Sequence, residues 1–394
     1  DLVVKRLISE VLHELSPNAW KVEYEREIWN CISLSTEIIS DMNSNRYINF
    51  KNGVLDLITF EMIPHSPETF TSYQMQFDFN EGAEAPRFRS FMCQITGSEP
   101  SLEAVLKECL ADLIMPEQRT EVMYMWIGNG ANGKSTLSKL ISKMFDEDAI
   151  SHVSLSSFGK QFGLQNLIGK RLNIANENEL SAYKVDTENL KAIVSGDKIH
   201  IDIKYKKPQE IQLPIKLLFL MNSLPISKDS TFGLLRKTML IPFNQTFKDE
   251  NCDRNLIDSL SEEMPGVFNY ILEGIIALRG NGYRLTQCEA VEQLRKTYYS
   301  GINPAVDFFN EAMVVEDGSS VSKKETVEAY AHWCNQSGID IEKNNMNKIF
   351  WERFKNVCSM RSIKYEEKKV NGYYHLKNFA IKEIYKPKPT QILL

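Results

Sequence analysis

The sequence predicts an α/β protein built around a parallel β-sheet, and two observations carry this prediction. Short apolar runs at 122–127, 171–175 and 215–221 are typical of buried strands, and the stretches after residue 133 and around 186–195 are typical of helices. Strands that alternate with helices indicate a parallel sheet covered on both faces. With 394 residues, the chain is long enough for two or three domains with sizeable cores.

The N-terminal region is expected to be helical at first and then to contain a hairpin. Residues 1–43 carry apolar side chains at helical spacing in two stretches, the second of which runs to Ile38 and Ile39. Asn52-Gly53, between β-branched and aromatic runs, predicts a β-hairpin. Residues 101–118 return to a helix that Pro116 ends.

The C-terminal third is expected to contain helices followed by a small separate module. Residues 254–280 predict helices interrupted at Pro265-Gly266. Two helices near 323–336 and 346–358 precede two strand-like runs joined at Asn371-Gly372. Helices followed by a β-hairpin predict a winged-helix-like module, although a small α+β cap would show the same pattern.

Charge is distributed unevenly along the chain. Residues 321–394 contain 14 basic and 8 acidic side chains, a net charge of +6, so the other 320 residues carry −12. A basic module on an acidic body is a hint of a surface that faces nucleic acid, and a solvated basic face is equally consistent with the charge alone.

Composition excludes several classes of protein. Hydrophobic residues make up 43% and charged residues 25%, which is typical of a globular protein and excludes a disordered or collagen-like chain. No apolar run approaches the ~20 residues of a membrane-spanning helix, so no membrane partner is expected. The seven scattered cysteines predict reduced thiols, without a zinc site or disulfides. The start at Asp1, without Met, predicts a fragment of a longer chain.

The strongest chemical signal is a complete G-x-x-x-x-G-K-S motif between an apolar strand and a helix. Its glycines let backbone N–H groups point at phosphate oxygens, and the helix N-terminus adds its dipole. Lys134 can reach the β- and γ-phosphates of ATP, and the Ser135 hydroxyl can ligate Mg²⁺. ATP and Mg²⁺ are therefore the expected cofactors. The expected binding residues are Gly128, Asn129, Gly130, Ala131, Asn132, Gly133, Lys134, Ser135 and Thr136.

Polar residues downstream are expected to complete a hydrolytic site. Glu177 ends an apolar run, where a carboxylate can bind hydrated Mg²⁺ or polarise water, and Glu179 is the second candidate. Asn222 ends the next strand and can hold the attacking water or sense the γ-phosphate, or it can cap a turn. Arg236 is either an ordinary surface arginine or a finger that reaches the ATP of a neighbouring subunit.

The order of these motifs resembles the superfamily 3 helicases, and more narrowly the helicase half of phage, plasmid and poxvirus-type primase-helicases. The similarity covers about residues 45–310. It implies an AAA+-like P-loop ATPase that forms a ring, usually a hexamer, and moves 3′→5′ on single-stranded DNA. It also implies a primase or polymerase domain in the full-length chain. The segments that carry it are GNGANGKST, RLNIANENE, VSGDKIHIDIKYKKPQEIQLPIKLLFLMNSLP and LLRKTMLIPFNQTF.

Roles follow from the resemblance by position. Asn178 separates the two acids, and Lys237 stands where relatives commonly have a second arginine, so the division of labour within each pair stays open. The resemblance assigns Lys134 and Ser135 to Walker A, Glu177 and Glu179 to Walker B, Asn222 to sensor 1 and Arg236 to the finger.

The resemblance also places a DNA-contacting pore hairpin between Walker B and sensor 1. Ammonium groups contact phosphates without reading sequence, and a tyrosine can stack on a base. A solubilising hairpin is the alternative, because lysine is common on exposed strands. The expected DNA contacts are Lys198, His200, Lys204, Tyr205, Lys206 and Lys207.

The sequence therefore predicts an ATP-dependent, ring-forming helicase that unwinds single-stranded and forked DNA in viral, phage or plasmid replication. A cytoplasmic location, in the host cell for a viral or phage protein, is expected. A P-loop small-molecule kinase and a nucleotide-gated DNA- or primase-binding scaffold are the alternatives. The predicted domains are an oligomerisation collar at 1–100, the ATPase core at 101–250, a helical segment at 251–310 and the basic winged-helix-like module at 311–394.

Overall fold

The computed structural model describes residues 2–15, 21–35, 45–69, 71–177, 187–222, 236–247, 253, 255–339 and 346–386. They belong to two compact units, Asp1–Asn43 and Ser44–Leu394. The first unit contains α1 (Leu2–Leu15) and α2 (Val22–Ser35), which confirms the two predicted amphipathic helices. The predicted continuation to Ile38 and Ile39 lies outside the described residues.

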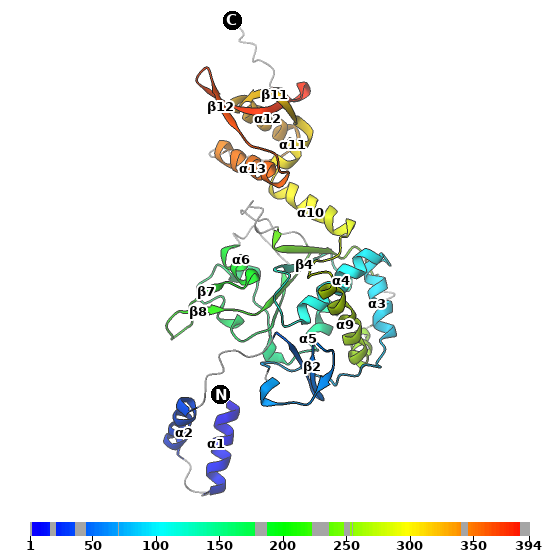
Figure 1. Ribbon diagram of the computed structural model, residues 1–394, viewed down its shortest axis with the longest axis vertical. Helices are drawn as coiled ribbons and strands as arrows, with labels where there is room; N and C mark the ends of the chain where they lie inside the picture. Colours follow the sequence, from blue (N-terminus) through cyan, green and yellow to red (C-terminus); the bar gives the residue numbers. More distant parts are fainter. Residues whose placement is uncertain are drawn as a thin grey trace. The chain divides into compact units, whose positions relative to one another are not determined.

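A five-stranded parallel sheet organises the second unit (Figure 1). Its strand order is β10-β4-β9-β6-β5, and every pairing in it is parallel. The prediction of a mixed α/β protein with a parallel sheet is confirmed. The strands are β4 (Met123–Ile127), β5 (Ile150–Ser151), β6 (Leu172–Glu177), β9 (Lys216–Met221) and β10 (Thr238–Pro242).

The first face of the sheet is covered by helices from three parts of the chain. Alternate side chains such as Trp126 and Leu218 enter this core, because successive residues of a strand point to opposite faces. The glycine-rich motif leads into one of these helices, so the motif lies at the carboxyl end of β4. The covering helices are α4 (Pro100–Ile114), α5 (Lys134–Ser142) and α9 (Met264–Gly280).

The second face packs against a shorter helix and a hairpin. Met125 and Phe219 point into this core, where apolar side chains of the hairpin meet them. The predicted helix around 186–195 and the predicted hairpin between the second and third strands are both confirmed. These elements are α6 (Thr187–Ser195), β7 (Lys198–Ile201) and β8 (Gln209–Gln212).

Residues 45–97 share the first core with the sheet. The predicted hairpin at Asn52-Gly53 is confirmed, and Phe50 pairs with Gly53 across it. The Phe50 ring centroid lies 4.8 Å from that of Phe268 on α9. The compact unit thus begins at Ser44, not at the predicted boundary after residue 100, because the apolar side chains of this hairpin pack on α9. The elements are β1 (Tyr47–Phe50), β2 (Gly53–Asp56), β3 (Met62–Ile63) and α3 (Pro86–Thr96).

Two helices follow the sheet, as predicted, but the break between them falls at Glu263 and not at Pro265-Gly266. α8 (Leu256–Glu262) ends just before α9, and Pro265 occupies the first turn of α9, where a missing N–H costs nothing. A Cβ at position 266 would lie 2.3 Å from the Glu84 carbonyl oxygen, so the backbones approach closely enough to need Gly266. α10 (Glu289–Ile302) then leads toward the C-terminal segment.

The C-terminal segment has its own hydrophobic core and an antiparallel sheet of order β11-β13-β12. The two predicted helices and the hairpin at Asn371-Gly372 are confirmed, whereas the first helix and first strand were not predicted. The elements are α11 (Ala305–Ala312), β11 (Met313–Ser322), α12 (Lys323–Gln336), α13 (Met346–Met360), β12 (Glu367–Val370) and β13 (Tyr373–Ile381).

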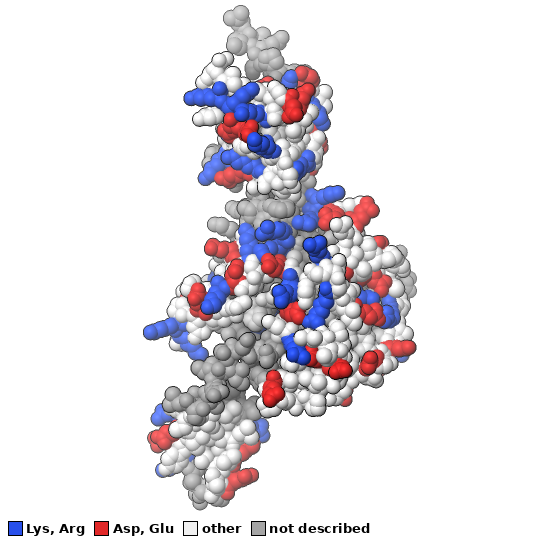
Figure 2. Space-filling model, viewed as in Figure 1, with Lys and Arg blue, Asp and Glu red and all other residues white. Residues whose placement is uncertain are grey.

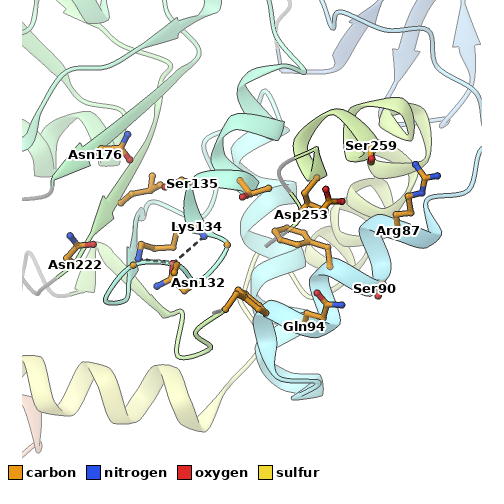
Figure 3. Close-up of a pocket in the computed structure, with 18 of the residues that line it drawn as sticks. Arg87, Ser90, Gln94, Asn132, Lys134, Ser135, Asn176, Asn222, Asp253 and Ser259 are labelled. Carbon is orange, nitrogen blue, oxygen red and sulfur yellow. Dashed lines mark hydrogen bonds between the residues drawn. The ribbon is translucent and has the colours of Figure 1, made fainter. Parts of the chain in front are cut away.

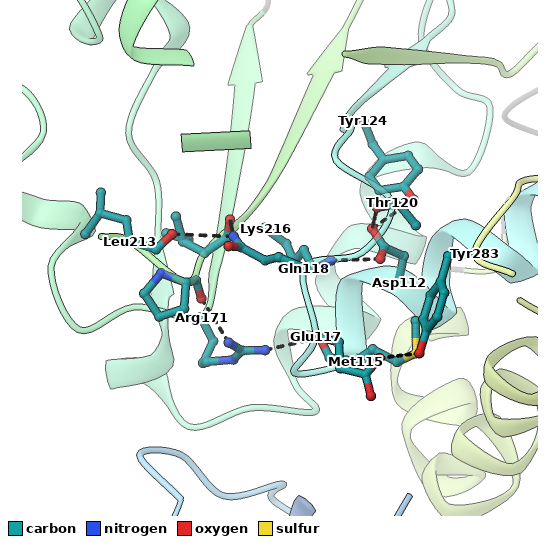
Figure 4. A network of polar contacts seen from close by, with 12 residues as sticks. Asp112, Met115, Glu117, Gln118, Thr120, Tyr124, Arg171, Leu213, Lys216 and Tyr283 are labelled. Carbon is teal, nitrogen blue, oxygen red and sulfur yellow. Dashed lines mark hydrogen bonds and ion pairs between the residues drawn. The ribbon is translucent and has the colours of Figure 1, made fainter. Parts of the chain in front are cut away.

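A buried polar network closes the amino end of the parallel sheet (Figure 4). The Lys216 ammonium at the start of β9 lies 2.7 Å from Asp112 Oδ1 on α4. Asp112 Oδ2 accepts hydrogen bonds from the hydroxyls of Thr120 at 2.8 Å and Tyr124 at 3.0 Å. Burial lowers the pKa of Lys216, and the neighbouring Asp112 opposes that shift. Every polar atom of the Asp112 carboxylate is therefore satisfied inside the fold.

The described part of the chain bears on two predictions, the one about the cysteines and the one about membrane-spanning helices. Six of the seven cysteines fall in it, all six are free thiols, and four are buried. Within the described ranges, no helix has both the length and the apolar character that crossing a bilayer requires.

Candidate functional site

The glycine-rich loop connects β4 to α5, in the strand–loop–helix context that the motif predicts. Gly133 is the N-cap of α5 with φ of +86°, a conformation that favours glycine. A Cβ there would lie 2.5 Å from Ile95 Cγ2, and one at Gly128 would lie 2.4 Å from the Phe243 carbonyl oxygen. The loop therefore needs glycine both for its turn and for its close neighbours. The first N–H groups of α5 and the helix dipole face the loop.

Lys134 is folded onto this loop (Figure 3). Its ammonium donates to the Gly128 carbonyl and, at 3.1 Å, to Asn132 Oδ1. The Asn132 amide nitrogen in turn donates to the Phe243 carbonyl at 3.3 Å. Burial lowers the pKa of Lys134 from 10.5 to about 8. Its partners are neutral dipoles, so this cation has no counter-charge among the described residues.

A cavity of about 1310 Å³ opens beside the loop, and Lys134 faces it (Figure 3). One side is the loop with the first turn of α5, and the carboxyl ends of β6 and β9 adjoin it. The other side is α3, and the segment after β10 completes the wall. The lining residues outside the loop are Pro86, Arg87, Ser90, Phe91, Gln94, Ser135, Thr136, Asn176, Leu220, Asn222, Phe247, Asp253, Leu256 and Ser259.

The end of β6 differs from the expected arrangement. Asn176 lines the cavity, whereas the Glu177 carboxylate accepts a hydrogen bond from the Leu155 N–H at 2.6 Å. Burial raises the pKa of Glu177. Sequence reasoning missed Asn176, although the period of two offered a signal: it shares the sheet face of Ile174, which packs with α5. The catalytic and metal-binding roles of Glu177 stay predictions.

Of the predicted catalytic residues Asn222 and Glu179, the structure describes only Asn222. Asn222 directly follows β9 and lines the cavity, as expected for a residue near the phosphates. Glu179 lies outside the described residues. The structure therefore places Lys134, Ser135 and Asn222 around one cavity, together with the unpredicted Asn176.

Arg236 lies at the opposite end of the sheet from the loop. It is exposed and comes two residues before β10, which runs parallel to β4. The five residues of β10 span about 17 Å, so Arg236 is well separated from the carboxyl ends of the strands. Lys237 beside it forms an ion pair with Glu121 at 3.1 Å. Arg236 is not among the residues that line the cavity.

The β7–β8 hairpin presents basic and aromatic side chains to solvent. Ile199 and Ile201 anchor it in the second core, and Lys198 and His200, which alternate with them, are exposed. Figure 2 shows basic side chains projecting from its tip. Tyr205 at the tip is fully exposed and has φ of +62°. The exposed residues predicted to contact DNA are Lys198, His200, Lys204, Tyr205, Lys206 and Lys207.

A metal ion bound beside the loop would need phosphate oxygens among its ligands, in addition to protein side chains. In the part of the chain that the structure describes, no group of three or more His, Cys, Asp or Glu side chains is placed to hold a metal. Side-chain oxygens of Ser135, Asn176 and Asn222 line the cavity. Such a set fits Mg²⁺, which keeps several waters and binds substrate phosphates together with a few protein oxygens.

Several known proteins are similar to this chain. A family described as "D5 N terminal like" matches residues 5–97, and a "Family of unknown function (DUF5906)" matches residues 126–236. Protein 184R of Invertebrate iridescent virus 6, which carries a helicase name, is 21% identical over 417 residues. Replication protein E1 of Human papillomavirus type 41 is 25% identical over 215 residues. The resemblance to superfamily 3 primase-helicases is confirmed.

These matches differ in extent. The alignment with 184R covers 91% of this chain and 42% of the relative, and that with E1 covers 54% and 30%. Protein L207/L206 of Acanthamoeba polyphaga mimivirus, also with a helicase name, is 26% identical over 283 residues, 66% of this chain and 29% of the relative. The chain thus spans less than half of these curated relatives. Among solved structures, the apo C-terminal region of NrS-1 is 15% identical with a TM-score of 0.48, covering 80% of this chain and 84% of that one.

Proposed function

We propose that this chain is the ATP-driven motor of a superfamily 3 DNA helicase that acts in viral, phage or plasmid replication. The glycine-rich loop that ends in Lys134, open to a large cavity, carries the proposal. The N-terminus of α5 attracts phosphate, and an ammonium held only by neutral dipoles can turn to the β- and γ-phosphates of ATP. The helicase names of the viral relatives support the same activity.

The fold supports an AAA+-like P-loop core with added modules. The loop lies at the carboxyl end of β4, an inner strand of the parallel sheet, where open α/β sheets bind ligands. The order helix, strand, two helices and hairpin in residues 305–381 supports a winged-helix-like module. The two-helix unit at residues 1–43 is proposed to contribute to an oligomerisation collar.

Hydrolysis is proposed to use ATP with Mg²⁺. Ser135, Asn176 and Asn222 would hold the ion and the γ-phosphate end, and the bound ion would neutralise phosphate charge. Glu177 is proposed to position or deprotonate water once its carboxylate leaves the Leu155 N–H, with Glu179 as its partner. The raised pKa of Glu177 suits a group that accepts a proton.

DNA is proposed to pass along the β7–β8 hairpin inside a ring of subunits. Its lysines match a phosphate backbone, and the exposed Tyr205 ring can stack on a base. Arg236 is proposed to reach the ATP of a neighbouring subunit, since it lies far from its own cavity. A hexamer moving 3′→5′, with a primase or polymerase domain in the full-length protein, completes the proposal.

Unwinding of a forked DNA tests the proposed function. The protein is expected to separate the strands with ATP and to remain inactive with a non-hydrolysable analogue, and single-stranded DNA should stimulate ATP hydrolysis. Replacing Lys204, Lys206 and Lys207 with alanine should abolish stimulation and flatten the salt dependence of DNA binding, because fewer counterions are released. The matched control is Lys139→Ala, an exposed lysine on α5. ATP turnover that DNA does not affect would contradict the helicase assignment.

A further inference from the structure

We infer that α3 forms a nucleoside subsite of the cavity, so that the ligand is recognised through its base as well as its phosphates. The inference rests on the proposed nucleotide site and adds a second wall to it. α3 packs directly on the phosphate loop: a Cβ at Gly133 would lie 2.5 Å from Ile95 Cγ2 and 3.3 Å from the Phe91 ring. The loop and α3 are therefore two sides of one cavity, held together by van der Waals contact.

One face of α3 is turned toward this cavity. Ser90, Phe91 and Gln94 line it, and their spacing of three and four residues places them on the same side of the helix. Arg89, the residue just before Ser90, bonds instead to Glu273 on α9. Figure 3 shows Ser90 and Gln94 on α3, apart from Lys134 on the loop. A ligand with its phosphates on the loop would extend along this face.

The cavity is larger than a triphosphate needs. Its volume of about 1310 Å³ exceeds the roughly 300–1,000 Å³ typical of pockets for drug-sized ligands. Phe247 lines it with a partly buried ring, and the Phe247 N–H donates to the Ala131 carbonyl at 2.7 Å. That bond fixes the segment carrying the ring to the phosphate loop. An aromatic ring at a set distance from a phosphate site offers a stacking surface for a base.

Polar groups on the same face match the edge of a base. The Gln94 side chain carries an amide donor and a carbonyl acceptor, which is the pattern that base edges present. Across the described ranges, neither the Gln94 amide nor the Ser90 hydroxyl has a hydrogen-bond partner in the protein, so both are available to a ligand. Stacking on Phe247 and hydrogen bonding to Gln94 together distinguish a nucleotide from a bare polyphosphate.

Calorimetric titration with Mg²⁺ and either ATP or inorganic tripolyphosphate tests the subsite. The unaltered protein is expected to bind ATP about tenfold or more tightly than tripolyphosphate, the scale of one base stacked on an aromatic ring. Gln94→Leu and Phe247→Ala should each weaken ATP binding by about five- to tenfold and leave tripolyphosphate binding unchanged. Cys93→Ser, an exposed neighbour on α3 outside the cavity lining, is the matched control.

The outcomes separate the subsite from the phosphate site. Equal affinity of the unaltered protein for ATP and tripolyphosphate would overturn the nucleoside subsite and leave the loop assignment intact. So would unchanged ATP binding in Gln94→Leu, a surface change that should not disturb folding. Failure to bind either probe would instead overturn the proposed function. Melting temperatures of all variants show whether an effect on binding comes from loss of the fold.

Discussion

Two buried lysines stand at opposite ends of the same parallel sheet, and their partners differ. Lys134 and Lys216 are each 4% exposed, and burial lowers the pKa of both. Lys216 has the Asp112 carboxylate at 2.7 Å, whereas Lys134 has one carbonyl and one side-chain amide. Removing an ion from water is costly unless a counter-charge replaces the lost solvation. The fold supplies that charge at the amino end of the sheet, and an anionic ligand would supply it at the carboxyl end.

Replacing Lys134 gives the largest expected effect on activity and little effect on folding. Lys134→Met should abolish ATP turnover, since no other cation lines the phosphate end of the cavity among the described residues. The free energy of unfolding should stay the same or rise, because an uncompensated buried charge is removed. Steady-state ATPase assays and denaturant titration measure the two quantities, with Lys139→Met as control. Turnover within threefold of the unaltered protein would refute the assignment of Lys134.

Arg236 lies at the amino end of the sheet, and the proposed function has it act on the ATP bound at the carboxyl end of a neighbouring subunit's sheet. Arg236→Ala should lower ATP turnover by about 10³-fold or more, as for arginines that act across an interface. Subunits with Arg236→Ala and subunits with Lys134→Ala, each nearly inactive, should regain some activity when mixed, since one interface then combines an intact loop with an intact arginine. No recovery in rings shown to be mixed would favour a purely structural role for Arg236.

Replacing Lys216 should give the reverse of the Lys134 result. Lys216→Met leaves Asp112 buried without its counter-ion, and the free energy of unfolding should fall by about 3–5 kcal/mol. Asp112→Leu combined with Lys216→Met should recover much of that loss, because no unpaired charge remains. Denaturant titration of the two variants measures the difference. A single variant as stable as the unaltered protein would show that the pair does not hold α4 to β9.

Substitutions at the end of β6 distinguish a role in binding Mg²⁺, proposed for Asn176, from a role in hydrolysis, proposed for Glu177. Asn176→Leu should weaken binding of Mg²⁺ together with ATP by about tenfold and leave Mg²⁺-free nucleotide binding unchanged. Glu177→Gln should slow turnover with little change in binding, and more severely than Glu179→Gln. Titrations with and without chelator, beside single-turnover rates, distinguish these effects. A loss of Mg²⁺-free binding in Asn176→Leu would point to a structural role.

The smallest expected effect is the uptake of a fraction of a proton by Lys134 when nucleotide binds. The pKa of Lys134 is about 8 without ligand, so part of its population is neutral at pH 8. Phosphates favour the charged form, and nucleotide binding should therefore take up protons at pH 8–9 and weaken as pH rises. Because the unfolded chain binds more protons than the native one between pH 8 and 10.5, this lysine's contribution to stability rises across that window. Calorimetry in buffers of different ionisation enthalpy detects the uptake, which Lys134→Met should lack.

Much of the fold could be predicted because its signals are local. The strands before the glycine loop and before Asn222 contain continuous apolar runs, and such runs are typical of strands buried on both faces. The turn at Asn371-Gly372 needs only its own residues. By contrast, β11 was missed: most of its side chains are exposed, and it pairs with β13, which lies about sixty residues further along the chain. Its polar sequence carries no strand period to recognise.

The sequence by itself determined the phosphate loop, because glycine conformations, the helix start and the position of Lys134 all depend on eight adjacent residues. Only the tertiary structure decided which neighbours complete the site. A shift of one residue along a strand moves a side chain to the other face, and long-range pairing decides which face receives α5. That is why Asn176 lines the cavity while Glu177 bonds to Leu155, and why α3, far from the motif in sequence, forms the second wall.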